Sequence, residues 1–359
     1  MDKNGFGSSP IRTYKKQNNS NPLRTLLVLL MTVVIIIAVI LFVMSLTGTG
    51  LFADKKPAET TPGETTPEVT TPEATTPEQT TPEITTPETP DDPNAVKYTT
   101  ISKTAAQIGK GDLLLINTDY LYKFSESDLL EDLYKVSPYF EVNGSKYQLK
   151  YSTVSQFKLL AEAFYDSVGG THKLLIMDAY RDFDTQNGYH ESNPTGAVPA
   201  GASDYHSGST VNLKTWNTET AKVEALSSEN GSSWLRQHAY EYGFVFRSAG
   251  KGNIVGYDIT WQLRYVGLPH AEYMYVNNYC LEEYLSKLST QHRYVEGGKN
   301  NLVIECIDGN IYEVYYTEGT TEEGAEAMIP VPSNKRFTIS GDNMQGFIVT
   351  VLIYEGSAK

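Results

Sequence analysis

The residues best suited to chemistry lie between Asp178 and Gly267. Arg181 carries a planar guanidinium, which can hold a carboxylate through two parallel hydrogen bonds. His206 offers an imidazole, a side chain that binds zinc and moves protons near neutral pH. Asp178 stands three residues before Arg181, so the two could equally form a structural ion pair at a strand end. These residue types indicate either a site for an acidic group or a structural role.

Several blocks in this stretch resemble, in order and spacing, those of the VanY-type D-alanyl-D-alanine carboxypeptidases. The blocks are the segment with Asn117, the Tyr180-Arg181 turn with Gln186, the loop into Ser203, the segment His238 to Phe244, and Arg264 to Gly267 with His270. The resemblance covers residues of about 110–288. It implies an α+β fold, the VanY/hedgehog-like zinc D,D-peptidase core, and an enzyme family that removes the terminal D-Ala from peptidoglycan stem peptides.

The resemblance also implies that the zinc ligands are substituted. The family holds its metal with a His and an Asp of one motif and the His of a later motif. This chain has Tyr205 at the first His, Asn212 at the Asp and Gln262 at the second His. Neutral amides bind a dication far more weakly than imidazole or carboxylate, and a tyrosine would have to lose a proton with a pKa of about 10. These positions therefore read as degenerate metal positions.

The position of the catalytic base is substituted as well. Ile259 lies two residues before Trp261, where the family has its Glu. Asp258 could stand in for that Glu, and His206 could enter the metal set by a one-residue shift. Such a shift in a strand turns the side chain to the opposite face, and neither rescue restores the other missing ligands. We expect no catalytic residue and no cofactor, with zinc only if the active alternative holds.

The residues that would hold a ligand are retained. In the family, the arginine that matches Arg181 binds the C-terminal region of the substrate. Gln186 and Ser203 match neighbouring motif positions. The resemblance thus implies substrate-binding roles for these three residues, with the ion pair to Asp178 as the alternative for Arg181.

Hydrophobic patterning predicts the elements that position these residues. A helix over residues 153–168 has one apolar face, a Thr-x-x-Gln capping box at its start and a Gly-Gly pair after its end. Further elements are strands at 111–117, 173–179, 210–216, 244–247 and 261–266, helices at 125–135, 233–243 and 269–288, and a long polar loop at 182–209. His238 and His270 fall outside the metal set and are expected to be packed or capping histidines.

The N-terminal part predicts a membrane anchor and a stalk. Residues 1–24 form a basic tail, and residues 25–46 are 22 uncharged residues that can cross a bilayer core of about 30 Å as a transmembrane helix. A cleaved signal peptide fits less well, because its apolar run is usually about 7–15 residues. The basic tail indicates a cytoplasmic N-terminus and an extracellular remainder. Residues 47–95 repeat Thr-Thr-Pro-Glu and are expected to form a disordered, extended linker.

Two folded parts follow the linker. We predict a D-alanyl-D-alanine carboxypeptidase-like core domain over residues 96–290 and a small all-β subdomain over residues 291–359. The strands of the subdomain are predicted at residues 302–307, 311–316, 337–340 and 347–354. It carries no catalytic constellation, so a structural or binding role is expected. Cys280 and Cys306 could pair or stay free.

The charge distribution argues against a nucleic-acid partner. Of the net charge of −14, residues 1–24 contribute +4 and residues 54–93 contribute −8, which leaves −10 for the remainder. The leading hypothesis is a membrane-anchored, extracytoplasmic pseudoenzyme that binds peptidoglycan stem peptides or regulates. One alternative is an active zinc D,D-carboxypeptidase with a rearranged site. Another is a non-catalytic scaffold whose β subdomain binds a protein partner.

Overall fold

The computed structural model of this chain describes residues 95–123 and 130–356. These residues belong to one compact unit, Thr86–Lys359. The predicted transmembrane helix at 25–46 and nearly all of the predicted linker lie outside the described residues. Among the residues that are described, no helix is long and apolar enough to cross a bilayer.

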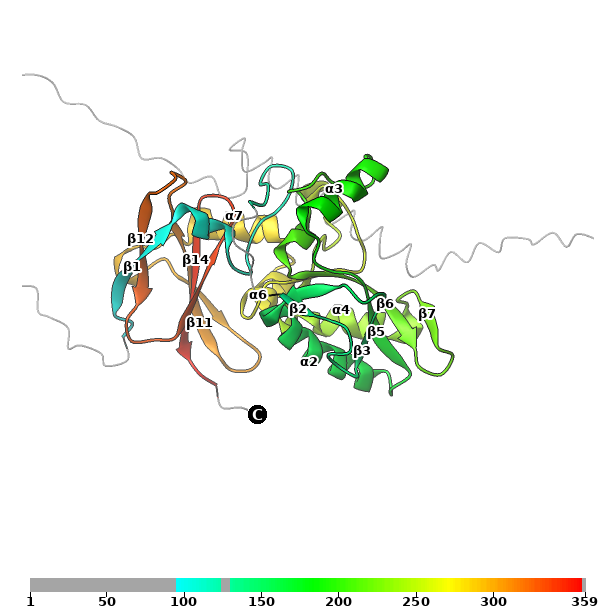
Figure 1. Cartoon of the computed structure of the whole chain (residues 1–359). Helices are drawn as coiled ribbons and strands as arrows, with labels where there is room; N and C mark the ends of the chain where they lie inside the picture. Colours follow the sequence, from blue (N-terminus) through cyan, green and yellow to red (C-terminus); the bar gives the residue numbers. More distant parts are fainter. Residues whose placement is uncertain (1–94, 124–129, 357–359) are drawn as a thin grey trace, which may run out of the picture. The chain divides into compact units, whose positions relative to one another are not determined.

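A mixed sheet lies at the centre of the peptidase-like part (Figure 1). Its strand order is β3-β5-β6-β9-β8, with β7 beside β6; β3 and β5 are parallel, and the other pairs are antiparallel. The strands are β3 (Phe140–Val142), β5 (His172–Asp178), β6 (Thr210–Asn217), β7 (Lys222–Glu224), β8 (Phe244–Phe246) and β9 (Gln262–Tyr265). The four strands predicted for this region are confirmed as β5, β6, β8 and β9.

Helix α2 (Tyr151–Ser167) covers this sheet with its apolar face. Phe157 is fully buried, and its ring meets the rings of Phe140 and Phe244 edge to face at 5.2 and 5.8 Å. The helix was predicted correctly, but its capping box was wrong. The helix begins two residues before Thr153, and the buried Thr153 hydroxyl instead lies 3.3 Å from that of Ser209.

Several other predictions for this part are wrong. The long loop at 182–209 contains helix α3 (Phe183–Ser192), because Asp182 caps it by accepting a hydrogen bond from the Thr185 N–H at 2.7 Å. Of the predicted helix at 125–135, residues 125–129 lie outside the described residues, and the remainder contains a short strand, β2 (Leu130–Asp132), paired with β4 (Gln148–Lys150). The remaining helices are α4 (Ser232–His238), α5 (Gly252–Val255), α6 (His270–Val276) and α7 (Leu281–Gln291). The last two replace the single helix predicted at 269–288.

The β part near the C-terminus has a four-stranded antiparallel sheet in the order β10-β11-β14-β13. Its strands are β10 (Leu302–Glu305), β11 (Ile311–Glu318), β13 (Phe337–Gly341) and β14 (Gly346–Tyr354), all of them predicted. Two strands were missed, β1 (Tyr98–Thr104) and β12 (Glu326–Pro332), which pair with each other. The predicted boundary at residue 290 assigns β1 to the core domain, whereas in the structure β1 pairs with β12 of the C-terminal β part. Cys280 and Cys306 are both free and buried.

Candidate ligand site

Three neighbouring strands bring two of the substituted metal positions into one row. The register of β5 and β6 pairs Asp178 with Asn212, and the register of β6 and β9 pairs Asn212 with Gln262. Residues directly opposite each other on antiparallel strands share a face, with Cβ atoms about 4.5–5.5 Å apart. Asp178, Asn212 and Gln262 therefore stand side by side on one face of the sheet.

Tyr205 completes the set from the short helix η2 (Asp204–Ser207). It is buried, and its ring lies 4.4 Å from the guanidinium carbon of Arg181. Burial raises the pKa of Tyr205 and the Asp178 carboxylate adds to this, while Arg181 and a hydrogen bond with Gln262 act in the opposite direction. The net effect is a rise, so the phenol keeps its proton at neutral pH. The three substituted positions lie together, but they present two amides and a phenol.

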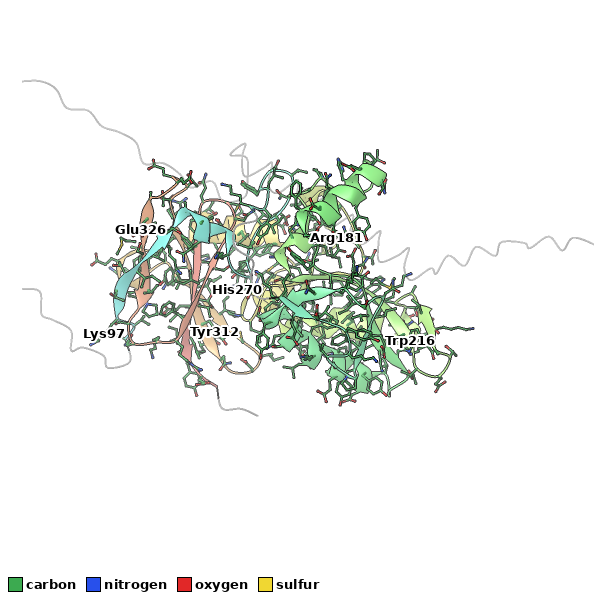
Figure 2. The ribbon with its side chains drawn as sticks, in the orientation of Figure 1. Lys97, Arg181, Trp216, His270, Tyr312 and Glu326 are labelled. Carbon is green, nitrogen blue, oxygen red and sulfur yellow. The ribbon has the colours of Figure 1, made fainter. Side chains whose placement is uncertain are left out.

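Arg181, which lies close to helix α3 (Figure 2), is held by Asp178 and Gln186. Its Nε donates to Asp178 Oδ1 at 3.2 Å, and one terminal nitrogen pairs with the other oxygen of that carboxylate. The second terminal nitrogen donates to Gln186 Oε1 at 2.8 Å. These contacts use three of the five N–H groups of the guanidinium. Among the described residues the other two, one on each terminal nitrogen, have no acceptor.

Aromatic rings and a buried amide fix the position of this guanidinium. The ring of Tyr189 in α3 lies 4.2 Å from the Arg181 guanidinium carbon, so Arg181 contacts both Tyr189 and Tyr205. Gln186 is buried and donates through its Nε2 to the Val198 carbonyl at 2.7 Å. The ion pair with Asp178 that the sequence allowed is present. It holds Arg181 in place and leaves the outer edge of the guanidinium for a ligand.

His206 is bound to the backbone on both sides of its ring. Its Nδ1 lies 2.7 Å from the Arg181 carbonyl oxygen, and its Nε2 accepts from the Gly201 N–H at 3.0 Å. A ring nitrogen that accepts a hydrogen bond carries no proton, so His206 is neutral with its proton on Nδ1. Burial lowers its pKa, which agrees with this form. In this arrangement His206 could become a metal ligand only by giving up one of these two backbone hydrogen bonds.

The other site residues from the sequence lie around this centre. Ser203 is buried at the start of η2. Asp258 is exposed and accepts from the Ser248 hydroxyl at 2.7 Å, and the Ile259 carbonyl accepts from the Gln262 N–H at 3.2 Å. Asp258 is thus engaged as a surface partner of Ser248.

The side chains at the metal positions do not fit zinc. Zinc in proteins takes imidazole nitrogen, thiolate or carboxylate, and Tyr205, Asn212 and Gln262 supply none of these. In the part of the chain that the structure describes, no three His, Cys, Asp or Glu side chains gather closely enough to hold a metal ion. The donor set therefore supports binding through hydrogen bonds and no step through a metal.

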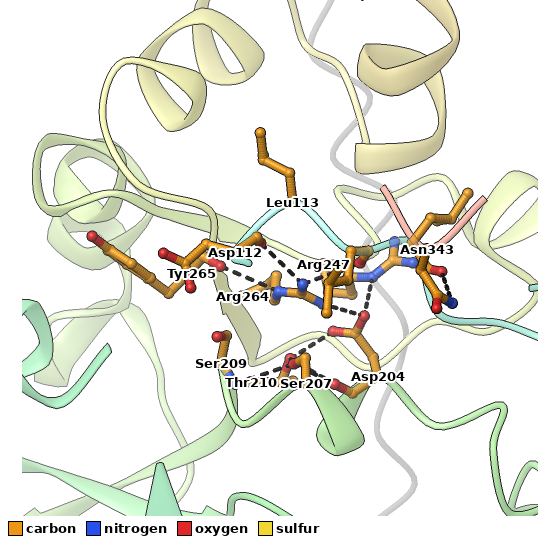
Figure 3. Close-up of polar contacts among 12 residues, drawn as sticks. Asp112, Leu113, Asp204, Ser207, Ser209, Thr210, Arg247, Arg264, Tyr265 and Asn343 are labelled. Carbon is orange, nitrogen blue, oxygen red and sulfur yellow. Dashed lines mark hydrogen bonds and ion pairs between the residues drawn. The ribbon is translucent and has the colours of Figure 1, made fainter. Parts of the chain in front are cut away.

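A buried charge network that the sequence did not reveal is centred on Asp204 (Figure 3). Asp204, next to Tyr205, accepts from Arg264 Nη1 at 2.6 Å and lies 3.2 Å from Arg247 Nε. Arg247 in turn makes a two-pronged contact with Glu282 at 2.7 and 2.9 Å. Burial acts to raise the pKa of Asp204, but the two arginines outweigh it, and the pKa lies below its usual value. Adjacency of Asp204 to a motif position was the only sequence signal for it.

Arg264 also explains why residues 111–117 form no strand. One of its terminal nitrogens donates to the carbonyls of Asp112 and Leu114, each at 3.1 Å (Figure 3). The Leu115 N–H donates to the Asp342 carbonyl at 2.9 Å. These backbone groups are satisfied by a side chain and a loop instead of a neighbouring strand. The predicted strand is wrong, although its apolar residues are buried as expected.

Comparison with known proteins agrees with this geometry. The family profile described as VanY, D-alanyl-D-alanine carboxypeptidase, matches residues 147–268. A D-alanyl-D-alanine carboxypeptidase of Enterococcus faecium is 33% identical over 260 residues, which cover 69% of this chain and 77% of that protein.

Solved structures show the same fold. The vancomycin-resistance D,D-dipeptidase VanXYg, in complex with a D-Ala-D-Ala phosphinate analogue, superposes with a TM-score of 0.59 at 22% identity. The match covers 71% of this chain and 99% of that one. A VanY D,D-pentapeptidase in complex with Zn(II) overlaps less, with a TM-score of 0.39, 20% identity, and coverage of 48% and 98%. The superposition on VanXYg confirms the mixed α+β architecture expected from the sequence.

Proposed function

Since this chain belongs to the VanY family of D-alanyl-D-alanine carboxypeptidases, we propose that it is a zinc-less member that binds peptidoglycan stem peptides and does not cleave them. The observation that carries this proposal is the row of Asp178, Asn212 and Gln262, closed by Tyr205. Of these four residues, Asn212, Gln262 and Tyr205 stand at the metal positions of the family, and their uncharged side chains do not supply a zinc site that could acidify a water molecule.

Arg181 supports a binding role. Its two remaining N–H groups lie on the two terminal nitrogens, which suits a carboxylate at the end of a peptide. Asp178 and Gln186 hold the guanidinium in a fixed orientation, so little side-chain entropy is lost on binding. A stem peptide that ends in D-Ala-D-Ala offers such a carboxylate. Gln186 and Ser203 take supporting roles around it.

Metal content and catalysis are tested together on the purified full chain in detergent. We expect less than about 0.1 zinc per chain after dialysis against micromolar zinc, since a structural or catalytic site would fill under these conditions. We expect no release of D-Ala from diacetyl-L-Lys-D-Ala-D-Ala above the rate without protein. Stoichiometric zinc with release that EDTA abolishes would establish the active carboxypeptidase instead.

Binding is measured by calorimetry with the same peptide. Arg181→Ala should weaken binding roughly 30- to 300-fold, as expected for loss of a charged hydrogen-bond pair. Arg336→Ala is the matched control, because Arg336 is an exposed arginine in an ion pair with Glu355. The control should bind like the unaltered chain. Equal binding by both variants would favour the scaffold alternative, in which the β subdomain holds a protein partner.

We place this domain outside the cell membrane. The predicted helix at residues 25–46 would anchor it, with the N-terminus in the cytoplasm and the repeat at 47–95 as a spacer toward the cell wall. Protease added to intact cells should remove the C-terminal domain and spare a tag at the N-terminus. Protection of the C-terminal domain until the membrane is permeabilised would contradict this placement.

A further inference from the structure

The side-chain oxygen of Gln262 is a buried acceptor without a donor. Gln262 is 1% exposed, and among the described residues its Oε1 has no hydrogen-bond partner. Buried polar atoms without a partner are rare in folded proteins, and each one calls for an explanation. This atom stands at the position where the family has its second zinc-binding histidine.

A second buried polar group of this kind belongs to Tyr257. The Tyr257 hydroxyl is buried and, in the described part of the chain, makes no hydrogen bond. Gln262 forms a hydrogen bond with Tyr205, and the two phenols of Tyr205 and Tyr257 interact only through charge. Gln262 therefore borders Tyr205, whose ring contacts Arg181.

We propose that Gln262 Oε1 accepts a hydrogen bond from the N–H of the ligand's last peptide bond while Arg181 holds the terminal carboxylate. This inference rests on the proposed function and specifies what the site recognises. In a peptide, one Cα separates the last N–H from the terminal carboxylate, so the two receptors must be neighbours. Arg181 and Gln262 meet this condition, because Tyr205 contacts both of them.

The entry of the ligand displaces the Tyr205 ring from this position. Oε1 is enclosed in the described structure, and the Tyr205 side chain is its polar neighbour beside Arg181. Movement of the ring exposes the acceptor beside the edge of the guanidinium that Asp178 and Gln186 leave open. A ligand with an ester in place of the last amide has no N–H and presents a second oxygen to Oε1. The site thus selects amides over esters at this bond.

The test compares two probes on the unaltered full chain. One is diacetyl-L-Lys-D-Ala-D-Ala, and the other is the same molecule with D-lactate as the last residue, which replaces the amide by an ester. The amide should bind roughly 10- to 100-fold more tightly, because a buried acceptor left without its donor penalises the ester. This comparison requires no variant to fold.

Gln262→Met, which keeps the length of the side chain, then assigns the preference to its atom. The variant should lose affinity for the amide and bind both probes within about 3-fold of each other. Gln237→Met, on the exposed face of α4, is the matched control and should keep the full preference. Persistence of the preference in Gln262→Met would overturn the assignment.

The failures of the two proposals are distinguishable. Equal binding of amide and ester to the unaltered chain, both weakened by Arg181→Ala, overturns the role of Gln262 and leaves the binding function standing. An absence of binding for both probes overturns the binding function and this inference with it.

Discussion

At the residue scale, the positions that match the zinc ligands of the family hold side chains suited to hydrogen bonding. Where a zinc enzyme presents imidazole nitrogen or carboxylate oxygen, Asn212 and Gln262 present amides, and burial keeps Tyr205 protonated. The remaining ionic contact is between Arg181 and Asp178. Because an isolated buried cation is costly, this carboxylate stabilises the partly buried guanidinium of Arg181.

Restoring the ligands tests whether these positions still converge on one point. The triple variant Tyr205→His, Asn212→Asp and Gln262→His should gain at least about 100-fold in zinc affinity over the unaltered chain, since three good donors would replace three poor ones. Competition with a zinc-binding dye measures this gain. The double variant without Asn212→Asp should gain much less. A triple variant that binds no more zinc than the unaltered chain would mean that the side chains no longer converge.

The buried carboxylate of Asp204 makes a second residue-scale prediction. Asp204→Asn leaves Arg264 and Arg247 without their shared anion, and we expect a loss of about 3–5 kcal/mol in the free energy of unfolding. Urea denaturation measures it. Glu355→Gln, which breaks an ion pair exposed to solvent, should leave stability unchanged within error. A similarly small effect of Asp204→Asn would show that the network is relaxed or hydrated.

At the element scale, close packing of α4 against α2 depends on one glycine. Gly231 has a φ of +97°, and an added Cβ would lie 2.6 Å from a ring carbon of Phe164 and 2.7 Å from Val168. Phe164 belongs to the buried face of α2, so it has little room to move. The helix can therefore start at this point only without a side chain at residue 231.

Two glycine substitutions separate steric contact from backbone strain. Gly231→Ala and Gly256→Ala both place a side chain at positive φ, but a Cβ at Gly256 meets nothing within 4 Å. Gly256→Ala should cost about 1–2 kcal/mol of unfolding free energy from backbone strain alone. Gly231→Ala should cost a further ~1–3 kcal/mol from overpacking. Equal losses, measured by urea denaturation, would contradict the contact with Phe164 and Val168.

At the scale of the whole molecule, His270 joins the peptidase-like part to the C-terminal sheet. Its Nδ1 lies 2.7 Å from the Tyr284 hydroxyl in α7, and its Nε2 lies 3.0 Å from the Thr350 hydroxyl in β14. Burial lowers the pKa of His270 to about 3. The packed histidine expected from the sequence is confirmed. Because it contacts both parts as a neutral ring, its protonation in acid opposes folding.

The direction in which stability changes with pH follows from proton binding at His270. Between pH 6.5 and about 3 the unfolded chain binds a proton at His270 and the folded chain does not. Stability from this residue is therefore complete above pH 6.5 and falls by about 1.4 kcal/mol for each pH unit below it. His270→Gln should show a shallower fall than the unaltered chain when urea midpoints are compared from pH 7 to pH 4. His238→Gln should follow the unaltered chain, and an identical slope in His270→Gln would contradict the assignment.

Local pattern made much of the fold predictable. Helix α2 and strands β5, β6, β8 and β9 were found because each has a run of apolar residues with its own period. Helix α3 was missed because its residues are mostly polar, and it forms through its Asp182 cap. Strands β1 and β12 were missed because each depends on a partner more than 200 residues away.

The sequence by itself determined the family, because residue types and motif spacing are properties of the chain. Only the tertiary structure decided that Asp178, Asn212 and Gln262 form one row, since strand register cannot be read from separate segments. It also decided that backbone groups occupy both nitrogens of His206. The physical reason is that each contact joins groups brought together only when the sheet has formed.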